Sequence, residues 1–109
     1  MDNSIDNPEA ISELLDYQDG SVVSRTLVKD KAGTVTVFAF DAGESLSEHT
    51  APYDTLLMVA EGAARVTIAT DVHNVTTGQI LRLPAKVPHA VHAVERFKML
   101  LVMIRVTGK

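Results

Sequence analysis

The chain has 109 residues with a net charge of -4, and 46% of its residues are hydrophobic and 22% charged, which predicts one globular domain and argues against nucleic acid as the main partner. It contains no cysteine, so disulfides, thiolate metal sites and cysteine nucleophiles are excluded. No apolar run approaches the ~20 residues of a membrane-spanning helix, and the acidic start does not resemble a secretion signal, so we expect no membrane partner and a cytoplasmic location.

Residues 1–20 are predicted to form a short N-terminal helical segment that precedes the main domain, residues 21–109. Asn7 suits the cap of a helix, and Pro8 suits its first position. An apolar stripe at helical spacing follows, formed by Ile11, Leu14 and Leu15. Gly20 ends the segment, because glycine next to aspartate favours a turn.

The rest of the chain alternates short β-prone runs with turn residues. The predicted strands are Ser21–Lys29, Thr34–Phe40, Asp54–Ala60, Ala64–Ile68, His73–Thr76, Ile80–Leu83, Ala90–Val94 and Phe97–Val106. Six to ten short strands predict an all-β antiparallel sandwich or barrel. The last strand is apolar on both faces, so both should be covered, by the opposite sheet and a partner chain or by the N-terminal helix. One of its faces should fill the barrel with Phe97, Met99, Leu101 and Met103.

Four histidines are the main candidates for metal binding or proton transfer: His49, His73, His89 and His92. Gly43 is followed by five residues and His49, with Gly62 further along. Gly78 is followed by five residues, Pro84 and then His89. These spacings resemble the two motifs of the cupin family, over about Ser21 to Val106. The resemblance implies a small single-domain cupin of the RmlC-like type: an antiparallel double-stranded β-helix, or jelly-roll barrel, around a small-molecule pocket.

The resemblance also implies where a cupin metal would bind. The four ligand positions of metal-binding cupins correspond here to His49, Ala51, Thr55 and His89. Ala51 cannot bind a metal, and the hydroxyl of Thr55 is a poor substitute for a carboxylate. The two histidines alone would hold a divalent transition metal (Zn, Ni, Fe or Mn) only weakly. Asp54 adjoins Thr55, but neighbouring side chains of a regular strand point to opposite faces.

Two further histidines are expected at the surface. His73 lies away from both motifs, and the three-residue offset of His92 from His89 puts the two on opposite faces of a regular strand. The second motif of the family has a glycine where this chain has Lys86. Three arginines lie in predicted strands, and one of them could pair with an anionic ligand: Arg25, Arg65 and Arg82.

Three functions are compatible with these residues. The first is a small-molecule-binding domain whose ligand contacts His49, His89, Tyr53 and Thr55. The second is a metal-dependent dioxygenase or isomerase with the two histidines as ligands. The third is a metal-free epimerase or isomerase with one histidine as the base. Whether the chain is an enzyme stays open. A homodimer is expected, because several strands are apolar on both faces and cupins of this size usually pair.

Overall fold

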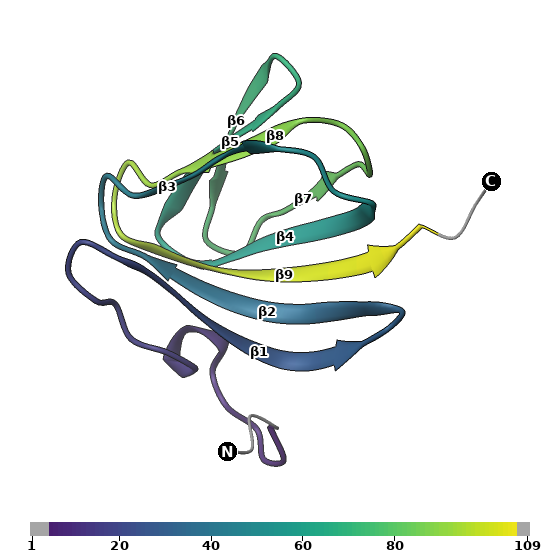
Figure 1. Ribbon diagram of the computed structural model, residues 1–109. Helices are drawn as coiled ribbons and strands as arrows, with labels where there is room; N and C mark the ends of the chain where they lie inside the picture. Colours follow the sequence, from purple (N-terminus) through teal and green to yellow (C-terminus); the bar gives the residue numbers. More distant parts are fainter. Residues whose placement is uncertain (1–4, 107–109) are drawn as a thin grey trace.

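Two antiparallel sheets face each other in the computed structural model, which describes residues 5–106 (Figure 1). The larger sheet has the order β1 (Val22–Asp30), β2 (Gly33–Phe40), β9 (Phe97–Arg105), β4 (Tyr53–Glu61) and β7 (Ile80–Leu83). The smaller has the order β3 (Ser45–His49), β8 (His89–His92), β5 (Ala63–Ile68) and β6 (Asp71–Thr76). These nine strands of the described residues confirm the predicted all-β barrel.

The core lies between the two sheets, because every second side chain of the central strands points inward. Phe97 and Met99 are fully buried and Leu101 nearly so, as the alternation predicts. The ring of Phe97 stacks on that of Phe40 from β2, with centroids 4.5 Å apart. Each such buried side chain stabilises the fold by about 1.5–3 kcal/mol.

The predicted N-terminal helix is wrong beyond a single turn. The turn η1 (Ile11–Glu13) is a 3-10 helix that follows Ala10, and no side chain caps it. Its two hydrogen bonds join Glu13 to Ala10 and Leu14 to Ile11, three residues apart. Short helices are marginal unless tertiary contacts stabilise them, and of this turn and its flanks only Leu14 is buried. Among the described residues, no helix has the length and apolar character that crossing a bilayer requires.

Contacts with the barrel hold the N-terminal segment in place. The Lys98 ammonium donates a hydrogen bond of 2.5 Å to the Ser12 carbonyl and lies 4.7 Å from the centre of the Tyr17 ring. The Tyr17 hydroxyl donates a 2.6 Å bond to the Glu61 carboxylate. Burial and this carboxylate raise the pKa of Tyr17 well above its ordinary value. The segment that contains Ser12 and Tyr17 therefore lies against the larger sheet mostly as extended chain rather than as a helix (Figure 1). We call residues 10–20 the strap.

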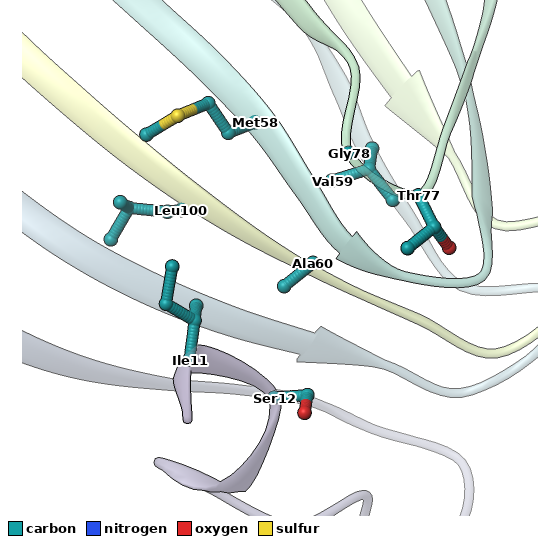
Figure 2. A pocket seen from close by; sticks show the side chains of 8 residues that line it. All are labelled: Ile11, Ser12, Met58, Val59, Ala60, Thr77, Gly78 and Leu100. Carbon is teal, nitrogen blue, oxygen red and sulfur yellow. The ribbon is translucent and has the colours of Figure 1, made fainter. Parts of the chain in front are cut away.

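The strap covers only part of the outer face of the larger sheet. A groove of about 290 Å³ remains between η1, β4 and β9. Figure 2 shows Ile11 reaching from the turn towards Leu100 of β9 and Met58 of β4. Further along β9, Ile104 is 56% exposed. We expected both faces of the last strand to be covered, but only its inner face, which packs against the smaller sheet, is covered along its length.

Candidate functional site

His49 and His89 stand opposite each other in the β3–β8 pair. The register pairs Leu46 with Val91 and then His49 with His89, so β3 carries one extra residue between the two pairs. Without this β-bulge, Glu48 would stand opposite His89 and His49 would point outward. The bulge therefore turns the first histidine towards the barrel interior.

The two imidazole rings are in edge-to-face contact, with centroids 4.4 Å apart and planes at 70°. Nδ1 of His49 lies 2.8 Å from the Ser47 carbonyl, and Nδ1 of His89 lies 3.3 Å from the Val87 carbonyl. A carbonyl oxygen only accepts hydrogen bonds, so each ring donates from Nδ1. In the neutral rings, both Nε2 atoms then carry a free lone pair.

The two histidines differ in their surroundings. His49 is exposed at the mouth of the barrel, whereas His89 is only 9% exposed. Burial lowers the pKa of His89, and the neighbouring His49 lowers it further. His89 is therefore neutral near pH 7, and its Nε2 can accept a hydrogen bond or a proton.

The space beside the rings is small and mostly apolar. It measures about 50 Å³, and its walls are Leu46, His49, Ala51, Thr55, Leu83, His89, Val91, Met99, Leu101 and Met103. One water molecule occupies about 30 Å³ of liquid, so the enclosed part holds one or two small atoms or groups. Typical sites for organic ligands measure about 300–1,000 Å³.

The donor set does not complete a metal site of the kind the fold family uses. Ala51 and Thr55 line the cavity at the positions of two further ligands. Within residues 5–106, no group of three or more His, Asp or Glu side chains is arranged to hold a metal ion. Asp54 accepts a 2.9 Å hydrogen bond from the Ala85 backbone and does not line the cavity. The residues present would leave a metal ion with two protein ligands, fewer than the three or four usual for zinc.

Tyr53 lies outside the residues that line the cavity. Its hydroxyl accepts a 3.2 Å hydrogen bond from Arg105, whose guanidinium carbon lies 5.2 Å from the centre of its ring. His73 is exposed on β6, and His92 lies on the outer face of β8, where its Nδ1 is 2.6 Å from the Ser45 hydroxyl. The structure thus brings together three of the four proposed ligand-binding side chains.

Three walls of this cavity were not predicted from the sequence: Leu46, Leu83 and Val91. Val91 follows His89 by two residues, so simple alternation already puts both on one face, and that signal was available. Leu46 precedes His49 by three residues, and only the bulge brings the two to the same face.

Comparisons with known proteins agree with this fold. A family model described as a cupin domain matches residues 36–105. A conserved protein of unknown function from Streptococcus pyogenes is 32% identical over 95% of this chain and 91% of its own, with a TM-score of 0.90. A cupin superfamily protein from Desulfitobacterium hafniense is 27% identical over 94% of each chain, with a TM-score of 0.89. A cupin 2 conserved barrel domain protein from Leptotrichia buccalis is 38% identical over 86% of this chain and 46% of its own, with a TM-score of 0.84. A search of curated proteins gives no match.

Proposed function

The chain belongs to the cupin family, and from this premise we propose that it binds a small organic molecule at the mouth of its barrel, with His49 and His89 as the polar contacts. The observation that carries the proposal is the contact between the two rings, each tied through Nδ1 to a backbone carbonyl. The rings are thereby fixed in orientation before a ligand arrives, which lowers the entropy cost of binding.

The chemistry of the site favours a ligand with a hydrogen-bond donor. Because each ring donates from Nδ1 to a carbonyl, Nε2 is the atom left to accept a hydrogen bond, so a hydroxyl or amine group suits the site. The apolar walls suit a hydrocarbon group beside it. Only about 50 Å³ is enclosed, so one group of the ligand enters and the rest lies at the rim. Tyr53 and Arg105 form that rim in this proposal, and Thr55 contacts the inserted group.

A ligand screen with matched histidine variants tests the proposal. Sugars, keto acids and phenols are added in a thermal-shift assay, where a ligand of the folded state raises the melting temperature. Replacement of His49 or His89 by Ala should weaken binding of any hit at least about tenfold, since each removes one hydrogen bond of about 1.4 kcal/mol. His73→Ala, which changes an exposed histidine of β6, should leave it unchanged. Equal binding by His49→Ala and the unmodified protein would refute the proposal.

Weak metal binding is the second candidate, and the two free Nε2 atoms favour it, because a ligating imidazole commonly donates its other nitrogen to a carbonyl. Water or the organic ligand would supply the remaining donors. Metal analysis and zinc titration of untagged protein test this candidate. It predicts loss of binding in His49→Ala, and metal content that is unchanged in this variant would contradict it.

A metal-free reaction is the third candidate, and the lowered pKa of His89 favours it, since a neutral imidazole can take a proton from a bound substrate. Turnover of a compound from the ligand screen, lost in His89→Gln, would support it. Full turnover in that variant would exclude His89 as the base.

We propose that the homodimer forms through the outer face of the larger sheet. A row of paired residues crosses this face from β1 to β7: Val28, Val35, Val102, Leu56 and Arg82. Val28 and Leu56 are exposed, and such apolar surface commonly marks an interface. Arg82 at the end of the row and Asp54 beside it offer a second copy one charge of each sign. Light scattering should give a dimer mass that Leu56→Lys lowers, whereas a monomeric unmodified protein would contradict the proposal. The cytoplasmic location stays a prediction.

A further inference from the structure

The outer face of the smaller sheet carries a second group of polar side chains. Strand β8 turns His89 into the barrel and His92 away from it, because His92 follows His89 by three positions, an odd number. The register pairs His92 with Ser45 of β3 on one side and with Arg65 of β5 on the other. These three side chains therefore form one row across three neighbouring strands.

A hollow opens beside this row. The next pair on this face of the sheet is Ala90 with Thr67, and Ser47 of the β3 bulge borders the same space. Ala90 has only a methyl side chain, so it leaves a depression between the longer side chains that surround it. The hollow measures about 150 Å³, the share of about five water molecules in liquid.

The polar side chains that line the hollow can all donate hydrogen bonds. The lining side chains include an arginine, a histidine and three hydroxyls, and no carboxylate is among them. The Ser45 hydroxyl lies 2.6 Å from Nδ1 of His92. When this hydroxyl donates to Nδ1, the neutral ring carries its proton on Nε2, which becomes a further donor.

Arg65 has no partner within residues 5–106, unlike Arg96 and Arg105. Arg96 bridges Asp19 at 2.6 Å and Asp41 at 2.8 Å, and Arg105 bonds to Tyr53. The Arg65 guanidinium is exposed and makes no hydrogen bond or ion pair with the described residues. A planar fork of free donors beside hydroxyl groups is suited to a planar or tetrahedral oxyanion.

We propose that this hollow is a binding site for the carboxylate or phosphate group of a small molecule. Arg65 pairs with two of the anion's oxygens, the hydroxyls of Ser47 and Thr67 donate to it, and the row of Ser45 and His92 closes one end. The site is separate from the barrel cavity, since β8 lies between them, and it does not depend on what the two inner histidines bind.

The test is an anion titration followed by amide NMR. Sodium phosphate and sodium acetate are added separately at constant ionic strength, with sodium chloride as the reference. The proposal predicts saturable shifts at the amides of Arg65, Thr67, Ala90 and His92, with a Kd of about 1 mM or tighter for at least one anion. The anion that binds more tightly identifies phosphate or carboxylate as the preferred group. Shifts that are linear in concentration, or that chloride reproduces, would overturn the proposal.

Three variants make the test specific. Arg65→Ala should weaken the binding of phosphate or acetate at least about tenfold. Arg65→Lys keeps the positive charge but loses the paired guanidinium donors, so its affinity should lie between those of Arg65→Ala and the unmodified protein. Lys29→Ala removes an exposed cation from β1 of the larger sheet and should leave the affinity unchanged. Both substituted positions are exposed, so the variants are expected to fold. Equal affinity in Arg65→Ala and the unmodified protein would disprove the site.

Discussion

His49 and His89 face each other because β3 contains one residue more than β8 requires. In a regular strand pair, Glu48 would stand opposite His89, but the extra residue puts His49 there instead. The buried ring of His89 therefore has an imidazole rather than a carboxylate as its neighbour. Glutamate at that position would raise the pKa of His89, whereas the observed neighbour lowers it. Burial lowers the pKa of His89 most, and the bulge adds to this effect by placing an imidazole rather than a carboxylate beside the ring.

The neutral state of His89 predicts how stability depends on pH. The folded pKa is lowered, so the unfolded chain binds more protons at this residue below its ordinary pKa of about 6.5. The free energy of unfolding should therefore fall as the pH drops from about 6.5 towards the lowered folded pKa. Urea titrations at several pH values measure this slope. His89→Gln should flatten it and His73→Gln should not, and an unchanged slope in His89→Gln would contradict the prediction.

Gly62 is predicted to be the least replaceable of the positive-φ glycines. Its φ is 82°, and an added Cβ would collide with the Arg96 carbonyl and lie 2.9 Å from Cβ of Phe97. Gly78 has a similar φ of 86° but open space around it. Gly78→Ala should cost about 1 kcal/mol, and Gly62→Ala about 3 kcal/mol or more. Chemical denaturation measures the free energy of unfolding of both variants. Equal losses would contradict the prediction, because they would mean that the loop before Phe97 moves to make room for the added Cβ.

Lys86 is predicted to be a strained position. Its φ is 66°, a left-handed conformation that glycine adopts without strain, and the family motif has glycine there. Lys86→Gly should therefore raise the free energy of unfolding by about 0.5–1 kcal/mol, whereas Lys86→Ala should give no gain. Urea midpoints of the two variants test this. A glycine variant no more stable than the alanine variant would rule out strain.

The two tyrosines are predicted to differ in their contribution to stability. Tyr17→Phe removes a half-buried bond and leaves the Glu61 carboxylate without its donor, which should cost about 1–2 kcal/mol. Tyr53→Phe removes only an exposed hydroxyl bonded to Arg105 and should cost less than about 0.5 kcal/mol. Thermal and urea unfolding compare the two. A larger loss in Tyr53→Phe would mean that the strap contributes little to stability.

The barrel was predictable because its signals are local. Alternating apolar residues gave most strands, and the spacing of Gly43, His49, Gly78 and His89 gave the order of the motifs. Strand β3 was not predicted, since Ser45–His49 is short, polar and interrupted by the bulge. The N-terminal helix was predicted from local propensity alone, whereas contacts of Tyr17 and Lys98 with the barrel determine its actual path.

The site was predictable only in part. The spacing placed two histidines inside the barrel, but not the contact between their rings, which requires the register of two strands distant in sequence. The grouping of Ser45, Arg65 and His92 depends on the same register, so the sequence indicated His92 only as a surface residue. The size of the cavity depends on how Met99, Leu101 and Met103 pack, and no periodicity encodes that.

The most direct test of the account is the tautomeric state of His49 and His89, read from the ¹⁵N chemical shifts of the imidazole rings at about pH 8, where histidine is ordinarily neutral. Both rings should carry their proton on Nδ1 and present an unprotonated Nε2 to the barrel mouth. A spectrum in which both rings are protonated on Nε2 would contradict it, because the rings would then offer donors where the proposed ligand needs acceptors.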